Sequence, residues 1–309
     1  MQKIKKILLA TDFSQASRDA AKSAALLAAK TEAKVYVLHV VPRLHGWSVD
    51  ESVLMQKVNN ILRDDAEAIR GVGVPDVETA ILIGNPPEEI VGHANLLEVN
   101  VIMIGSGEKN KGDRFPLGVT AENIIRSAFR PVWVVKRGSP ETIGKILCPI
   151  DFSGHSRLAF ANALALSEVF AAKLEVLNVT EKYAGAYYGM SFHASEIQAG
   201  ERKYARKEID QFLREFDLKD VNCERTVRSG KPHEEVLKAV TESGAELLVM
   251  GSLGRTGVTR ILLGSVALKI ARELPCSFVM TKSQDLIEQS RPINVRKPRK
   301  KFVPLEEFS

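Results

Sequence analysis

The sequence repeats itself, because segments of its first half recur in the same order in its second half. The apolar run that leads into Asp12-Phe13-Ser14 matches the run that leads into Asp151-Phe152-Ser153, at an offset of 139 residues. Three more matches follow at offsets of 139, 146 and 144 residues, and they pair 35–40 with 174–179, 84–91 with 230–237, and 131–135 with 275–279. Four matches in order, with small drifts in offset, indicate an internal duplication with loop insertions. A solenoid would show a much shorter period.

Each repeat alternates short β-branched runs with stretches that suit a helix. In the first repeat the apolar runs lie at 7–10, 35–41, 77–83, 100–104 and 132–136. Ser14 and Ser153 stand where a helix N-cap belongs, and Pro86 and Pro232 fall in the first turn of a later helix, where a missing N–H costs nothing. Continuous apolar strands in this order predict a parallel sheet that is buried on both faces and doubly wound.

A glycine pattern follows the fourth predicted strand, and only the second repeat has it in full. There the glycines are Gly251, Gly254 and Gly264, and Ser265 comes directly after the last one. The first repeat keeps the outer glycines, Gly105 and Gly118, but has Glu108 and Val119 at the other two positions. A glycine-rich turn before a helix presents backbone N–H groups to an anion, and the helix dipole adds to the attraction. The pattern therefore predicts an anion site in the second repeat.

Strand order decides whether this motif has a partner across the sheet. If the order is 3-2-1-4-5, it reverses between the first and fourth strands, and ligands bind at such a point, beyond the carboxyl ends of the strands. Asp151 ends the first strand and Gly251 ends the fourth, so both would face one crevice.

Structural alternatives exist for each of these features. The glycines could form a flexible loop with helix-capping residues, and Asp151 could be a cap for the next helix. The motif is not a Walker A loop, which ends in Gly-Lys followed by Ser or Thr. Here no lysine follows Gly254, and the next residues are Arg255 and Thr256. Ser153 and Ser156 are expected to be helix caps, and the six histidines form no paired metal-ligand pattern. The sequence shows no constellation typical of a catalytic centre.

Composition limits the class of protein. With 309 residues, 45% apolar and 26% charged, the chain can form two ordinary globular domains, and no apolar run is long enough for a membrane span. Three cysteines without metal-ligand spacing predict a reducing, cytoplasmic location. We expect domains at 1–140 and 141–283, and a basic, flexible tail at 284–309. The net charge of +5 is spread thinly, so nucleic-acid binding is expected, if anywhere, from the run at 296–301.

Together these residues resemble the universal stress protein family in its tandem form, over about residues 1–283. The resemblance implies two flavodoxin-like (Rossmann-like) five-stranded doubly wound sheets of order 3-2-1-4-5, paired as an intramolecular pseudo-dimer. The resemblance implies that family members with the full motif bind ATP, whereas members without it generally bind no nucleotide. Carried over residue by residue, the resemblance implies an adenosine pocket formed by Pro149, Asp151 and Val179. The ribose would lie along Met250 and Gly251. The phosphates would be held by Gly254, Arg255, Gly264, Ser265 and Val266.

The expected function is that of a cytoplasmic stress-response regulatory protein that binds ATP, with or without Mg, in its second repeat. Two alternatives stay open: a nucleotide-free interaction scaffold, and an adenine-nucleotide hydrolase of low activity. The protein partner is unknown, and two chains could associate further. Each repeat ends in an apolar strand, 132–135 and 277–280, that would lie at a sheet edge. We therefore predict that the two last strands pack together, with Trp133 partly buried between them.

Overall fold

The computed structural model describes residues 3–43, 51–107, 116–180, 194–219, 221–253 and 263–282. Strands and helices alternate in both repeats. The first repeat consists of β1 (Lys6–Thr11), α1 (Gln15–Thr31), β2 (Lys34–Val41), α2 (Glu51–Gly71), β3 (Val77–Ile83), α3 (Pro86–Leu96), β4 (Val101–Gly105), α4 (Val119–Ser127) and β5 (Val132–Val135). The second consists of β6 (Lys145–Ile150), α5 (Gly154–Phe170), β7 (Lys173–Thr180), α6 (Ala194–Leu213), β8 (Cys223–Ser229), α7 (Pro232–Ser243), β9 (Leu247–Gly251), α8 (Ser265–Glu273) and β10 (Ser277–Thr281).

The contacts divide the chain into two compact units. The N-terminal unit contains Gln2–Glu141 and also the segment that begins at Ser277. The C-terminal unit contains Thr142–Val258 and Leu263–Cys276. The last strand of the second repeat therefore belongs, by its contacts, to the N-terminal unit. The predicted domain limits follow the repeat in sequence, whereas these units follow the contacts in space.

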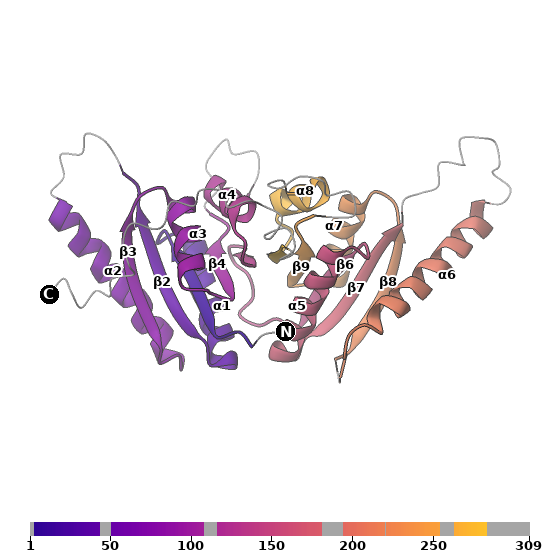
Figure 1. Cartoon of the computed structure of the whole chain (residues 1–309), viewed down its shortest axis with the longest axis horizontal. Coiled ribbons are helices and arrows are strands. Elements are labelled where there is room, and N and C mark those ends of the chain that lie inside the picture. Colours follow the sequence, from indigo (N-terminus) through magenta and orange to yellow (C-terminus); the bar gives the residue numbers. More distant parts are fainter. Residues whose placement is uncertain are drawn as a thin grey trace. The chain divides into compact units, whose positions relative to one another are not determined.

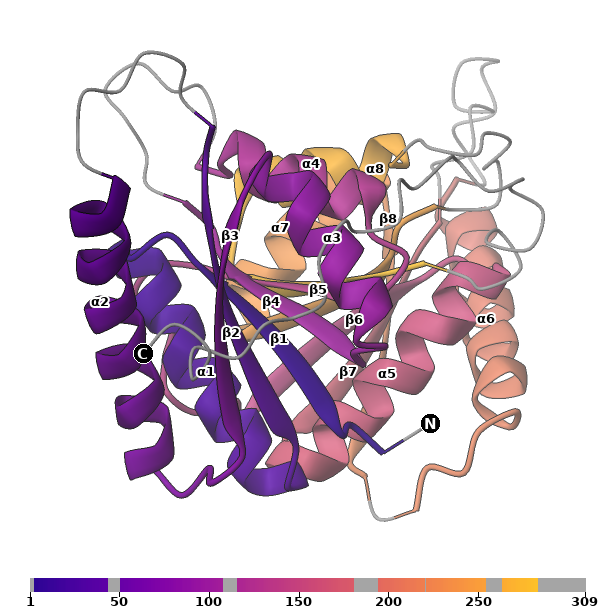
Figure 2. The same cartoon turned by 60° about the vertical axis from the view of Figure 1, so that its left-hand side comes forward.

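In the N-terminal unit, the strands of the first repeat are arranged in the order β3-β2-β1-β4-β5. All four neighbouring pairs are parallel, and the register places Leu9 beside Val37 on one side and beside Met103 on the other. Helices α1 and α2 pack together on the sheet, and α3 and α4 form a second pair (Figure 1; Figure 2). The predicted α/β fold and its order 3-2-1-4-5 are confirmed for this repeat.

In the C-terminal unit, the strands lie in the order β8-β7-β6-β9, which is the same 3-2-1-4 arrangement. Its pairs are also parallel, with Pro149 beside Leu177 and Leu147 beside Leu248. The inner strands of both units are buried, as the continuous apolar runs predicted, whereas no residue of the edge strand β8 is fully buried.

The predicted helix starts are also confirmed. Ser14 and Ser153 are N-caps in extended backbone, and their hydroxyls accept hydrogen bonds from the N–H groups of Ser17 and Ser156. Pro86 and Pro232 open α3 and α7. No helix in the described ranges combines the length and apolar character needed to cross a membrane.

Strand β10 pairs antiparallel with β5, and Val279 lies opposite Trp133. The two last strands of the repeats, which we predicted to pack together, are thus direct neighbours, and Trp133 is 2% exposed. The hydroxyl of Ser277 accepts a hydrogen bond from the N–H of Lys136 at 3.0 Å and shares another with the hydroxyl of Ser139 at 2.6 Å. The pseudo-dimer of the two units, and any wider association of chains, stay predictions.

Lys282 directly follows β10, and its amine donates a hydrogen bond to the carbonyl of Arg126, in the last turn of α4. Burial, together with the nearby charge of Arg126, lowers the pKa of Lys282 to about 8, from the usual 10.5. In the unfolded chain the lysine keeps its proton up to the higher pKa. Between these two values the unfolded state therefore binds more protons, and the free energy of unfolding rises with pH.

We expect Lys282→Met to flatten this rise, because methionine keeps the apolar bulk of the side chain but carries no titrating amine. Urea unfolding of the wild type and the variant at pH 7.5 and at pH 9.5 measures the difference. The wild type should gain more stability than the variant over this interval. An equal gain in both proteins would show that the amine of Lys282 is not buried as described.

Candidate functional site

Two parallel strands bring the predicted site residues to one edge of the C-terminal sheet. Asp151 directly follows β6, and Gly251 is the last residue of β9, which pairs with β6. Strand β7 lies on the other side of β6, so the order reverses between β6 and β9. Parallel strands end at the same edge, so the ends of β6 and β9 lie where the strand order predicts a ligand site.

Gly251 lies close against the first turn of α5. A Cβ placed on Gly251 would be 3.0 Å from the Cβ of His155 and 3.1 Å from its carbonyl carbon. In the first repeat, a Cβ on Gly105 would be 2.5 Å from the carbonyl carbon of Ala16. The first glycine of the motif therefore has a packing role in both repeats, which explains why the first repeat keeps it without the full motif.

The last motif glycine closes the loop after β9. The N–H of Gly264 donates to the carbonyl of Ser252 at 2.7 Å, and the N–H of Gly118 donates to the carbonyl of Ser106 at 2.8 Å. Gly264 and Gly118 are also the N-caps of α8 and α4. Both outer glycines are thus explained by the scaffold, and the difference between the repeats lies elsewhere.

The first turns of α4 and α8 differ in charge. Helix α4 carries Glu122 there, and this carboxylate accepts hydrogen bonds from Arg126 at 2.8 and 3.1 Å. Helix α8 has no acidic residue in its first turn, and Leu268 occupies the position of Glu122. The first N–H groups of any helix lack partners within the helix, and its N-terminus carries a partial positive charge. The start of α8 therefore favours an anion more than the start of α4 does.

The chain matches the profile of the universal stress protein family twice, at residues 3–136 and 142–282. It belongs to the universal stress protein family. The two matches also confirm the tandem organisation that the repeat indicated.

Individual relatives agree with this assignment. Universal stress protein MJ0531 of Methanocaldococcus jannaschii is 32% identical over 145 residues, which are 44% of this chain and 85% of the relative. A crystal structure of a universal stress protein from Archaeoglobus fulgidus has a TM-score of 0.66 at 21% identity and covers 91% of this chain and 99% of its own. One from Pseudomonas aeruginosa, a putative universal stress protein, also has a TM-score of 0.66, at 20% identity, and covers 93% of this chain and 96% of its own. The two structures show the shared fold.

Hydrogen bonds hold the turn after β6, which carries Asp151. The carboxylate of Asp151 accepts hydrogen bonds from the N–H of Ser153 at 3.1 Å and from its hydroxyl at 2.6 Å. Between them, Phe152 has a φ of 63°, a left-handed conformation that is uncommon for such a residue. Arg157 donates to the carbonyl of Phe152 and also pairs with Glu215 at 2.8 Å. The structure around it thus holds Asp151 in one orientation.

The first repeat has the same turn, with Phe13 at a φ of 64° and Asp12 bonded to the N–H of Ser14 at 3.1 Å. Burial acts to raise the pKa of Asp12, but hydrogen bonds from Ser14 and Ser17 outweigh it and hold the pKa below its usual value. The hydrogen bonds of this turn therefore favour the carboxylate form of Asp12.

The remaining predicted residues fall into three groups. Pro149, Val179, Gly251 and Gly264 are half-buried, Met250 is buried, and Ser265 and Val266 are exposed at the start of α8. Because Ile150 lies beside Asn178 in the register, Val179 comes next to Asp151 at the sheet edge. Gly254 and Arg255 lie outside the described residues, as does Glu108 of the first repeat. The structure therefore brings together the described part of the predicted set and does not test the central loop.

Ser252 is a candidate that the motif analysis missed. Its side chain is 1% exposed, and its hydroxyl has no hydrogen-bond partner among the described residues. A buried polar group without a partner is uncommon and calls for an explanation. In the first repeat, the hydroxyl of Ser106 makes a long contact of 3.4 Å to the carbonyl of Gly107. The signal in the sequence was the serine directly after Gly251, between two residues already assigned to the site.

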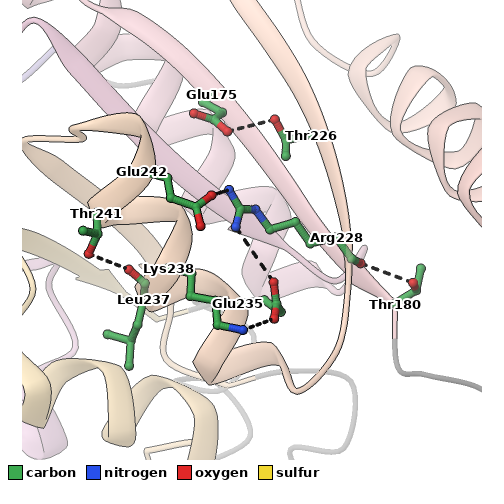
Figure 3. Close-up of polar contacts among 9 residues, drawn as sticks. All are labelled: Glu175, Thr180, Thr226, Arg228, Glu235, Leu237, Lys238, Thr241 and Glu242. Atoms are coloured by element: carbon green, nitrogen blue, oxygen red, sulfur yellow. Dashed lines mark hydrogen bonds and ion pairs between the residues drawn. The ribbon is translucent and has the colours of Figure 1, made fainter.

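A charged network supports the neighbouring edge, where β7 and β8 end (Figure 3). Arg228 pairs with Glu242 of α7 at 2.6 Å and with Glu235 at 3.9 Å, and Lys238 pairs with Glu235 at 2.8 Å. The hydroxyl of Thr180, next to Val179, donates to the carbonyl of Arg228 at 3.2 Å. These contacts fix the end of β7 and so the position of Val179. Among the described residues, no three His, Cys, Asp or Glu side chains gather closely enough to hold a metal ion.

The packing role of the first glycine can be tested by adding a methyl group. Gly105→Ala should lower the free energy of unfolding more than Gly251→Ala. The added Cβ at residue 105 would lie 2.5 Å from the backbone of α1, whereas the added Cβ at residue 251 would lie 3.0–3.1 Å from the side chain and backbone of His155 in α5. Overpacking of this kind costs about 1–3 kcal/mol. Urea unfolding of both variants measures the order.

Gly92→Ala is the matched control, because Gly92 lies inside α3 and a Cβ there would meet no atom within 4 Å. This change should leave stability unchanged or raise it, through the better helix propensity of alanine. Equal stability in all three variants would contradict the packing role.

Proposed function

We propose that this universal stress protein is a cytoplasmic regulatory protein of the stress response that binds ATP in its C-terminal unit and changes its interaction with a protein partner accordingly. The observation that carries the proposal is the start of α8. It lies at the carboxyl edge of the sheet, has no acid in its first turn, and is joined to the end of β9 by the hydrogen bond from Gly264 to Ser252. The full glycine motif precedes it.

ATP would extend along this edge, from the end of β6 to α8. The adenosine would lie against Pro149, Asp151 and Val179, and the ribose along Met250 and Gly251. The phosphates would be held by the N–H groups that open α8 and by the loop before it, with Gly254, Arg255, Gly264, Ser265 and Val266. When bound, ATP would supply the negative charge that the helix N-terminus favours.

The residues present fit such a ligand in two respects. Ser265 and Val266 are exposed, so the first N–H groups of α8 can be reached by a phosphate. The buried hydroxyl of Ser252 lies next in sequence to Gly251, and a ribose or phosphate oxygen would supply the hydrogen-bond partner that none of the described residues provides. The binding role of Ser252 is part of the proposal.

The N-terminal unit would bind ATP poorly. Glu122 already occupies the first turn of α4 with a negative charge, and Val119, in place of Ser265, is 78% exposed and offers no hydroxyl. Glu108, in place of Gly254, would add a second carboxylate to the phosphate path. One chain should therefore take up one ATP.

The charge of the first turn can be exchanged between the repeats. Leu268→Glu places the carboxylate of α4 in α8 and should weaken ATP binding about tenfold or more, by repulsion of the phosphates and by neutralising the helix N-terminus. Leu268→Gln is the matched control, since glutamine has the same size and no charge. Isothermal titration calorimetry on the full chain measures both variants. Equal affinity of the two would remove α8 from the phosphate site.

The loop can be tested by copying the first repeat. Gly254→Glu should abolish most ATP binding, because it adds bulk and a negative charge to the phosphate path. Ser265→Val should weaken binding less, since one hydrogen bond to a charged group contributes about 1.5–3 kcal/mol. The same calorimetry gives the stoichiometry, and two ATP per chain would contradict the proposed difference between the repeats.

A further inference from the structure

We propose that strand β10 couples the two units: it carries the state of the phosphate site at the start of α8 to β5 and α4 of the N-terminal unit. This inference rests on the proposed ATP site and adds to it a route by which occupancy is detected elsewhere in the chain. Three observations carry it, and each concerns one part of the segment from α8 to Lys282.

The link from α8 to β10 is short and constrained. It consists of Leu274, Pro275 and Cys276. Leu274 has a φ of 44°, its N–H donates to the carbonyl of Ile270 at 3.1 Å, and its side chain is 3% exposed. The ring of Pro275 fixes one further dihedral angle. A shift or rotation of α8 on phosphate binding is therefore passed to β10 with little slack.

Strand β10 is bound to the N-terminal unit by pairing with β5 and by the hydroxyl of Ser277. All five of its residues are buried, and three of them pair with β5: Phe278 with Val134, Val279 with Trp133, and Met280 with Val132. The hydroxyl of Ser277 holds the N–H of Lys136, one residue beyond β5. A displacement of β10 must therefore move β5 or break this ladder.

The far end of β10 reaches α4, the counterpart of α8 in the first repeat. Lys282 donates to the carbonyl of Arg126, and Arg126 in turn binds Glu122 in the first turn of α4. The chain thus connects the start of α8 to the start of α4, where Val119 is exposed. Because coupling between two sites acts equally in both directions, whatever binds at α4 would also change the affinity for ATP.

The experiment uses Trp133 as the reporter, since it lies on β5 directly opposite Val279. The sequence has two tryptophans, so Trp47→Phe leaves Trp133 as the sole emitter when the full chain is excited at 295 nm. Addition of ATP with Mg should change its emission, with a midpoint equal to the Kd from calorimetry. Gly254→Glu in the same background should abolish both signals.

The uncoupling variant is Ser277→Ala combined with Lys282→Met, which removes the anchors at both ends of β10. Its calorimetric Kd should stay within about threefold of the parent, while the emission change of Trp133 falls at least several-fold. Ser127→Ala is the matched control, because it removes a hydroxyl hydrogen bond on α4, to the carbonyl of Asn123 at 2.7 Å, without touching β10. This control should keep the full emission change.

Hydrogen exchange of the full parent chain gives a second measurement, which needs no variant to fold. ATP should slow or speed exchange in residues 132–135 and in α4, far along the chain from the phosphate loop. Calorimetric binding without any change in Trp133 emission or in this exchange would overturn the coupling and leave the ATP site intact. A failure of ATP to bind at all would overturn the proposed function, and the coupling with it.

Discussion

The candidate site depends on one close contact between a strand end and a helix start. Gly251 and the first turn of α5 approach so closely that a methyl group would lie 3.0 Å from His155. This contact brings the end of β9 to the segment that directly follows Asp151. The hydrogen bond from Gly264 to Ser252 then brings the start of α8 to the same place. Two helix N-termini and one carboxylate are thus brought together by the close packing of Gly251 and by the backbone hydrogen bond of Gly264.

The first repeat has the same contact between strand end and helix start, although it lacks the full glycine motif. Gly105 packs on Ala16, Gly118 bonds to Ser106, and Asp12 occupies the turn of Asp151. The duplicated scaffold has been kept, and among the described residues the starts of α4 and α8 differ in their side chains. Leu268 against Glu122 and Ser265 against Val119 change the charge and the hydrogen bonding of the helix start and leave the backbone alone. Electrostatics, more than fold, distinguishes the two crevices.

Sequence patterns predicted those features that depend on local chemistry. Strand alternation and the caps at Ser14 and Ser153 depend on neighbouring residues, and the structure confirms them. The duplication could be read from recurring segments of the sequence, and the two family matches confirm it. The role of Gly251 in packing on His155 was not predicted, because that contact joins residues 96 positions apart. Ser252 was missed for a similar reason: a hydroxyl without a partner becomes visible only when its surroundings are known. Lys282 and its contact with Arg126 likewise depend on where β10 lies.

The place of β10 gives a physical reason why the chain keeps a first repeat that lacks the full motif. An apolar strand such as β5, with Trp133 at its centre, would expose unpaired backbone groups at the edge of its sheet. The chain covers this edge with β10, whose residues are equally buried and whose three central residues are apolar. Because β10 pairs with β5, loss of the first repeat would expose the edge of β10. This holds whether or not the first repeat binds a ligand. Selection for the edge contact would then maintain the fold of the first repeat, while its helix start was free to acquire Glu122 and Val119.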